Sequence, residues 1–353
     1  MEKCNLKSNA NGSVTDIGIW YVNYNDEKMF ASNFGTGIPI KYRSLMPDGS
    51  WGIPCSNDIE MIDFYLEKLA EAKIDFILFD LTNGGLTAKI HNYGWDDRGE
   101  DYGNRYIVKN AKLVCKRIAK WNKEHDWQIK YAVAVGAYLQ IRGARHNGKE
   151  WTKPDPDIDI GTCVEWQAEA VYKDFFMNEE FGGDNHYQLD GKPLLIIHDW
   201  GENVLTVPHG WKNYKGDRTY GDKFTVRNGQ AGEGGTYGWN TRYGTLPDPE
   251  VECVCAGHST AHSTIPSIYR NKGRYYKKGW QVVLETLPRI VMIAGLNDYN
   301  ERSAIFPTDT SQCDFPGEEK WYNEKGELDP YLYWNITVDS IKKLRELNGE
   351  ERI

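Results

Sequence analysis

Residues able to do chemistry gather in one short stretch of the chain, residues 294–307, which reads AGLNDYNERSAIFP. Two carboxylates, Asp298 and Glu301, stand three positions apart in this stretch. If the chain turns there, both can reach one side, where one stays ionised as a base while the other holds a proton as an acid. The structural alternative is a network in which these acids pair with Arg302 and Arg270.

An apolar run precedes this stretch, and similar runs alternate with helical periodicity along the chain. Residues 75–81 (DFILFDL) and 129–139 (IKYAVAVGAYL) are almost continuously apolar, which is typical of strands buried on both faces of a parallel sheet. The expected strands cover residues 17–22, 75–81, 129–139, 192–200, 223–228, 251–259 and 289–298. The expected helices cover residues 58–69, 104–125, 162–180, 272–287 and 331–347.

Seven or eight such strand–helix units in a chain of 353 residues favour a closed (β/α)8 TIM barrel over an open sheet. No strong eighth strand is visible between Ala304 and Pro330, and no linker-like tract divides the chain. We therefore expect one α/β domain over residues 17–350, with extended loops between strands and helices. An N-terminal tail at residues 1–16 precedes it.

In a barrel, functional side chains collect where the strands end at the carboxyl edge. These strand ends are polar or aromatic here, and aromatic residues in Gly-rich loops suit stacking on a sugar ring. Any one of these residues could be a satisfied structural group, but their convergence on one rim favours a ligand. The predicted substrate-binding residues are Trp20, Tyr21, Asp80, Tyr138, His198, Trp200, Trp239, His258, Asn297 and Arg302.

Composition limits which kinds of binding partner and which cellular locations we expect for the protein. A net charge of −9 argues against a nucleic acid as main partner. No apolar run approaches the roughly 20 residues of a membrane span. The seven cysteines are odd in number and scattered, unlike a disulfide framework. Cys4 could be a lipid-attachment site after a removed leader, so we expect a periplasmic, outer-surface or secreted protein.

Two other motifs compete with the carboxylate pair. Cys253-x-Cys255-x-x-His258-x-x-x-His262 has the residue types of a zinc site, but its cysteines share one face of a strand pattern, as packed thiols would. The Gly-rich GQAGEGGTYG lacks the lysine of a phosphate-binding loop. We therefore expect no metal and no cofactor. Alternative acids stand in loops at Asp199, Glu202 and Glu233.

The stretch GLNDYNERSAIFP resembles N-E-W-x-E-G-T-x-I-E-P, a signature at the end of a late barrel strand in glycoside hydrolase family 99 and the related WbsX-like proteins. Asn297, Ile305 and Pro307 match as written. Looser similarities in the same order are IGIWYVNY, AEAKIDFILFDLTN, QLDGKPLLIIHDW and the helix-to-strand passage before the signature. The resemblance covers residues 17–310, and the signature is its specific part.

The resemblance implies a (β/α)8 barrel enzyme that cuts α-mannosidic bonds within a glycan, with retention of configuration. Asp298 would be the base that deprotonates the sugar's own 2-hydroxyl, which gives an anhydro-sugar intermediate. Glu301 would be the general acid and then the base. The sequence departs from the signature where Asp298 replaces Glu, Arg302 replaces Gly and Phe306 replaces the last Glu.

These departures bear on activity and on substrate. A carboxyl displaced on the order of 1 Å can cost about 100-fold in rate, so the substrate sits differently, or Asp298 has another task, or activity is lost. Arg302 could clamp an anionic sugar group such as a uronate or sulfate, so the sugar need not be mannose.

We interpret the sequence as a bacterial glycoside hydrolase that acts on a polysaccharide or complex glycan. It would be retaining and endo-acting rather than exo-acting, with Asp298 and Glu301 in catalysis. One alternative is a non-catalytic glycan-binding barrel. The other is a glycosyltransferase-associated protein, which would bind a nucleotide sugar, and the sequence shows no phosphate site for one.

Overall fold

The structure is a computed structural model of the chain, whose backbone folds into two compact units. Unit 1 joins Met1–Asp75 to Gly232–Ile353, and unit 2 is Phe76–Ala231. The residues described are 14–32, 37–82, 86, 104–136, 145–146, 149–150, 160–199, 211, 214–230, 237–238, 250–259, 265–314 and 318–349. For residues 104–105, 145–146, 149–150, 160, 199 and 230 this description covers the backbone alone.

Unit 2 is built on four parallel strands in the order β10-β9-β5-β4. Every residue of β4 is buried, as its apolar sequence requires. The four strands are β4 (Phe76–Leu81), β5 (Lys130–Gly136), β9 (Lys192–Asp199) and β10 (Thr225–Gln230). Its helices are α3 (Asn104–Glu124) and α4 (Ile160–Val171), which continues as a π-helical turn, Tyr172–Phe176. Short elements are β6 (Arg145–His146), β7 (Lys149–Glu150), β8 (Gln188–Leu189) and the 3-10 turns Gly183–Asn185 and Gly221–Lys223.

Unit 1 contains three further parallel strands, in which β12 (Ile290–Ala294) lies between β1 (Asp16–Tyr21) and β11 (Val251–Cys255). All of β12 and β11 is buried. The helices are α1 (Glu27–Ala31), α2 (Ile59–Glu71), α6 (Arg274–Thr286) and α7 (Leu332–Leu347), with a 3-10 turn at Asn271–Gly273. A small antiparallel sheet joins β13 (Thr308–Asp309), β2 (Arg43–Leu45) and β3 (Trp51–Gly52).

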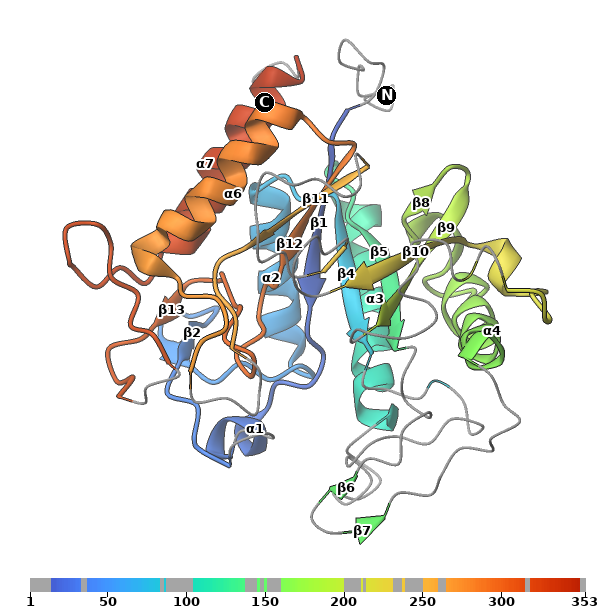
Figure 1. Cartoon of the computed structure of the whole chain (residues 1–353), viewed down its shortest axis with the longest axis horizontal. Coiled ribbons are helices and arrows are strands. Elements are labelled where there is room, and N and C mark those ends of the chain that lie inside the picture. Colours follow the sequence, from blue (N-terminus) through green and yellow to red (C-terminus); the bar gives the residue numbers. More distant parts are fainter. Residues whose placement is uncertain are drawn as a thin grey trace. The chain divides into compact units, whose positions relative to one another are not determined.

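Two helices of unit 1, α6 and α7, lie side by side as the orange and red ribbons of Figure 1. The Tyr276 ring of α6 meets the Tyr333 ring of α7 edge-on, with 6.0 Å between ring centres. The Tyr276 hydroxyl lies 2.9 Å from the Thr337 hydroxyl, so a buried polar atom is satisfied inside this packed seam. The pair therefore forms a fixed wall behind β11, which α6 also contacts.

All seven predicted strands are confirmed, and each predicted helix is present with ends within a few residues of those expected. Between residues 304 and 330, the part of the chain that the structure describes contains one strand, β13, which pairs antiparallel with β2 instead of joining the parallel strands. The described residues thus show a mixed α/β fold with parallel strands. Closure into an eight-stranded barrel and the single-domain boundaries remain predictions. No helix among the described residues is long and apolar enough to span a membrane.

Candidate active site at the end of strand β12

The stretch with the two carboxylates forms a closed loop directly after β12. The Leu296 amide donates to the Trp20 carbonyl at 2.8 Å, which continues the pairing of β12 with β1. The Phe306 amide donates to the Leu296 carbonyl at 3.1 Å, so the two ends of the loop are joined. Residues 297–305 are therefore held at the carboxyl end of the strand, where a parallel α/β fold places its functional groups.

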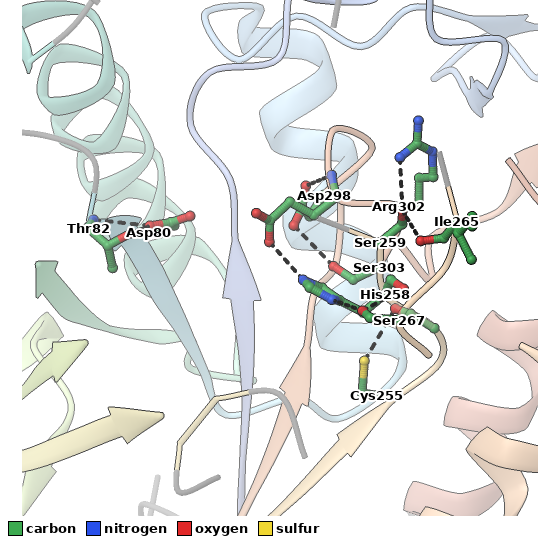
Figure 2. Close-up of polar contacts among 12 residues, drawn as sticks. Asp80, Thr82, Cys255, His258, Ser259, Ile265, Ser267, Asp298, Arg302 and Ser303 are labelled. Atoms are coloured by element: carbon green, nitrogen blue, oxygen red, sulfur yellow. Dashed lines mark hydrogen bonds and ion pairs between the residues drawn. The ribbon is translucent and has the colours of Figure 1, made fainter. Parts of the chain in front are cut away.

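Asp298 is the centre of this loop and is only 3% exposed. Its carboxylate accepts hydrogen bonds from the Glu301 amide at 2.9 Å and from the Ser303 hydroxyl at 3.1 Å. Its carbonyl accepts from the amides of Ser303 and Ala304, both at 3.0 Å. Figure 2 shows Asp298 and Ser303 facing each other. Donors aimed at both carboxyl oxygens stabilise the ionised form, which suits a base.

Glu301 meets a histidine from a different part of unit 1. Its Oε2 lies 3.1 Å from Nε2 of His258, and their side chains are 18% and 13% exposed. The backbone supports this contact, because the Ser259 amide donates to the Glu301 carbonyl at 2.9 Å. The loop after β11 thus delivers His258 to the loop after β12, although the two residues are 43 positions apart. Both groups remain partly open to a ligand.

The second ring nitrogen of His258, Nδ1, shows how many protons the His258–Glu301 pair holds. Nδ1 of His258 lies 2.7 Å from the Ser267 hydroxyl oxygen, and that hydroxyl can donate to the His258 carbonyl at 3.1 Å. When it does, Nδ1 must carry the hydrogen that Ser267 accepts. The contact between Nε2 and Glu301 then needs a further proton, held by the imidazolium or by the carboxylic acid. The pair therefore stores one proton beside the loop.

The same contact sets the pKa of the imidazole. Burial acts to lower the pKa of His258, but the hydrogen bond that the imidazolium donates to Glu301 and the negative charges of Glu301 and Asp298 outweigh it, so the pKa is raised above 6.5. Two carboxylates facing one imidazole thus favour its protonated form.

Asn297 bonds to the backbone of the chain after β1 and does not face a substrate. Its side-chain oxygen accepts from the Val22 amide at 2.8 Å, and its side-chain nitrogen donates to the Val22 carbonyl at 3.1 Å. Asn297 is 1% exposed, and its backbone carbonyl accepts from the side-chain amide of Asn25 at 2.8 Å. Both polar atoms of Asn297 thus continue the pairing beyond β1, which differs from the binding role predicted for it.

Arg302 also differs from the expectation of a clamp on the substrate. It is 4% exposed, and its guanidinium donates to the Ser259 hydroxyl at 3.2 Å. Its charge acts on Glu318, where it opposes the rise in pKa that burial causes. Figure 2 shows the guanidinium turned away from Asp298. The structural reason is a left-handed backbone at Arg302, with φ of 56°, which turns the chain after Glu301.

The remaining predicted residues divide into three groups. Trp20 and Tyr21 are 2% and 1% exposed, and the indole of Trp20 donates to the Tyr237 carbonyl at 2.7 Å, so both rings belong to the core of unit 1. Asp80 and His198 are buried in unit 2, where Asp80 accepts from the Thr82 hydroxyl at 2.7 Å. Outside the described side chains are Tyr138, Trp200, Trp239, Asp199, Glu202, Glu233 and His262.

Sequence reasoning missed the serines that complete the site. Ser303 is inside the signature stretch, at the position where the family signature has Thr, so its hydroxyl was a usable signal. Ser267 and Ser259 were not predictable. An isolated β-bridge between His258 and Ile268 places Ser267 beside His258, and no local sequence pattern predicts that bridge.

The zinc alternative places its cysteines inside the core. Cys253 and Cys255 are buried in β11, and burial raises the pKa of the Cys255 thiol to about 12. The Cys255 thiol donates to the Gly257 carbonyl at 3.3 Å. Among the described residues no cluster of three or more His, Cys, Asp or Glu side chains could hold a metal ion.

The fold is similar to that of solved glycoside hydrolases of the GH99 type. Two solved structures of the GH99 endo-alpha-mannosidase from Bacteroides thetaiotaomicron, one in complex with BIS-TRIS-propane, superpose with a TM-score of 0.56. Their sequences are 16% and 14% identical, over 94% of this chain and 98% of theirs. A glycoside hydrolase-like protein superposes with a TM-score of 0.50 at 10% identity, over 99% of this chain and 96% of its own. No protein-family model and no curated protein matches the sequence.

Proposed function

We propose that this chain is a glycoside hydrolase in which Asp298 and Glu301 carry the chemistry. The observation that carries the proposal is the arrangement of these carboxylates after β12. Asp298 is held by the Glu301 amide and the Ser303 hydroxyl, while Glu301 shares a proton with His258. One charged carboxylate and one proton-holding group are the two parts that cleavage of a glycosidic bond requires. The GH99-like fold supports this choice of chemistry.

The proposed reaction follows the resemblance. Asp298 takes the proton of the sugar's 2-hydroxyl while the freed oxygen attacks the anomeric carbon. The bond to the leaving sugar breaks, and the proton stored between Glu301 and His258 goes to the leaving oxygen. Water then opens the anhydro-sugar, with Glu301 as base, and the 2-hydroxyl is restored. Cleavage would be endo-acting with net retention, on a barrel that closes with eight strands, in a protein exported from a bacterial cell.

The test is release of reducing ends from a panel of neutral, uronate-containing and sulfated glycans. We expect Asp298→Asn and Glu301→Gln each to lower kcat by at least about 100-fold, as loss of a general acid or base does. Asp339→Asn, an exposed carboxylate on α7, is the matched control and should retain full activity. Full activity in both site variants would refute the assignment.

A specific observation favours a second candidate, a non-catalytic glycan-binding protein. Asp298 makes hydrogen bonds that a purely structural residue would make, since its carboxylate and carbonyl together tie four groups of the loop. That candidate predicts glycan binding by wild type with no reducing ends released. It also predicts that Glu301→Gln leaves the affinity unchanged. Calorimetric titration of the same panel separates the two candidates.

A further inference from the structure

A hollow lies in unit 1 beside the loop that carries His258. Its volume is about 810 Å³, and its walls come from residues 267–278 and 319–322. Four of the lining side chains are exposed cations: Lys272, Arg274, Lys278 and Lys320. We refer to this hollow as the basic pocket. The chain as a whole has a net charge of −9, so this local charge is opposite in sign to that of the molecule.

The positive charge of the basic pocket is only slightly offset by its own walls. The lining carboxylate is Glu319, and it accepts a hydrogen bond from the Arg270 amide at 2.9 Å. Arg270 also lines the pocket, but its guanidinium donates to the carbonyls of Arg302 and Ala304 and lies over the Trp321 ring. Arg270 is thus part of the core. The charge of Arg274 acts on the carboxylate of Glu324, which does not line the pocket. Lys272, Lys278 and Lys320 are therefore the cations that remain for a ligand.

The backbone adds to the positive potential of the basic pocket. Helix α6 begins at Arg274 in the pocket wall, and its first turn has no acidic residue and no side-chain cap. A helix N-terminus carries partial positive charge, which favours a negatively charged group. Arg274 is therefore unfavourable at this end by itself, and a bound anion would compensate its charge. Asn271 and Lys272, just before the helix, have φ of 46° and 55°.

Exposed tyrosines indicate what carries the negative charge. Tyr269 and Tyr322 line the basic pocket and are 58% and 37% exposed. A tyrosine ring offers an apolar face to the C–H face of a sugar, while lysine and arginine bind carboxylate or sulfate groups. An acidic sugar uses both features. A long nucleic acid polyanion is disfavoured by the net charge of the molecule.

The pocket is connected to the candidate active site by one residue. Ser267 lines the basic pocket, and its hydroxyl contacts Nδ1 of His258 at 2.7 Å. On the far side of the imidazole lies Glu301. The loop between β11 and α6 therefore borders both places. It leaves β11 at the carboxyl edge, where Glu301 also lies.

We propose that the basic pocket is a subsite that binds a uronate or sulfated sugar of the glycan cleaved beside it. This inference rests on the proposed glycosidase function and narrows its substrate to anionic glycans. Specificity would come from Lys272 before α6, from Lys278 on α6 and from Lys320. It would not come from Arg302, whose guanidinium is buried.

The experiment is calorimetric titration of Asp298→Asn, which prevents turnover, with three probes of equal length. They are oligogalacturonate, a sulfated galactan oligosaccharide and a manno-oligosaccharide. The pocket variant adds Lys278→Ala and Lys320→Ala, and the control adds Lys342→Ala and Lys343→Ala on α7, which removes the same charge from exposed positions. We expect the pocket variant to bind an anionic probe about tenfold more weakly and the control to stay within about twofold. Thermal unfolding of both variants confirms that they are folded.

The outcomes test the subsite proposal and the hydrolase proposal separately. Equal binding of neutral and anionic probes, or an unchanged affinity in the pocket variant, would overturn the subsite. Duplex DNA is titrated as a fourth probe, and tighter binding of it than of either anionic oligosaccharide would overturn the subsite as well. If wild type releases reducing ends from a neutral glycan and no anionic probe binds, the subsite fails while the hydrolase proposal stands. If anionic probes bind through the pocket lysines and no glycan is cleaved, the hydrolase proposal fails while the pocket stands as a glycan-binding site.

Discussion

The proton between His258 and Glu301 makes the stability of the site depend on pH. Because the pKa of His258 is raised in the folded chain, the protonated imidazole stabilises the fold fully below 6.5, and this contribution is lost as pH rises through the raised value. We expect His258→Gln to lower the free energy of unfolding by about 1–3 kcal/mol at low pH, the range for a hydrogen bond to a charged group. The difference from wild type should shrink above neutral pH. Urea unfolding between pH 5 and 9 measures it.

A matched control for this titration is His125→Gln, an exposed histidine of unit 2. It should leave the pH profile of the unfolding free energy close to that of wild type. A profile for His258→Gln that runs parallel to wild type at every pH would contradict the shared proton.

Two serine–aspartate bonds of equal length allow burial to be tested alone. The Ser303 hydroxyl donates to Asp298 at 3.1 Å inside the loop, and the Ser311 hydroxyl donates to Asp309 at 3.1 Å in a half-exposed turn. We expect Ser303→Ala to cost about 1–3 kcal/mol of unfolding free energy, since the buried carboxylate loses a donor that water cannot replace. Ser311→Ala should cost well under 1 kcal/mol, as exposed polar contacts do. Equal costs by urea unfolding would show that the Asp298 carboxylate is not held by Ser303.

At the scale of elements, α7 is fastened to the start of the strands by one side chain. Arg345 is 7% exposed and donates to the Thr15 carbonyl at 3.2 Å and to the Lys73 carbonyl at 2.9 Å. It also donates at 2.7 Å to Asp75, which accepts in turn from the Ile17 amide at 2.7 Å. Arg345 thus joins the last helix to the beginning of β1 and to the residue that precedes β4.

Breaking this link should destabilise the chain strongly. Arg345→Met keeps the buried stem but leaves Asp75 without its cation, which costs about 3–5 kcal/mol for a buried pair. Lys342→Met, on the exposed face of α7, is the control and should stay within about 0.5 kcal/mol of wild type. Guanidinium unfolding measures both variants. A loss below about 1 kcal/mol for Arg345→Met would mean that α7 is held by its apolar face alone.

The strands could be predicted from the sequence because each buried strand is an almost continuous run of apolar residues. Residues 76–81 and 290–294 are wholly buried, so nearly every position is apolar and the run is visible without partners. The small sheet of β2, β3 and β13 was not predicted. Its strands have two or three residues each. β2 and β3 form a short hairpin, and β13 joins it only because Pro307 and Leu45 are brought together from distant parts of the chain.

The site was only half predictable for the same reason. Asp298 and Glu301 share one loop, so spacing alone brought them together, and the left-handed φ of Arg302 explains why the family signature has Gly there. The partner of Glu301 is His258, 43 positions earlier, and no local pattern reports that contact. Trp20 and Tyr21 are buried, and their sequence positions did not predict this, because an aromatic residue at a strand end packs in the core as readily as it faces a ligand.

At the scale of the whole molecule, the chain passes between the two units twice, at Asp75–Phe76 and at Ala231–Gly232. The first crossing is unlike a domain boundary, because it falls at the first residue of a fully buried strand. Boundaries between independent domains fall in exposed, flexible linkers. Unit 1 is also made of two segments from opposite ends of the sequence. Both facts favour one cooperative structure, as the single-domain prediction requires.

We therefore expect one calorimetric unfolding transition, with equal calorimetric and van't Hoff enthalpies. A variant in each unit tests this. Arg345→Met acts in unit 1, and Glu165→Ala in unit 2 removes the carboxylate that accepts from the Tyr220 and Gly221 amides. Each should move the same single transition, and a loss of about 4 kcal/mol corresponds to roughly 5 °C from the usual unfolding entropy per residue. Two transitions, of which each variant moves only one, would show that the units are separate domains.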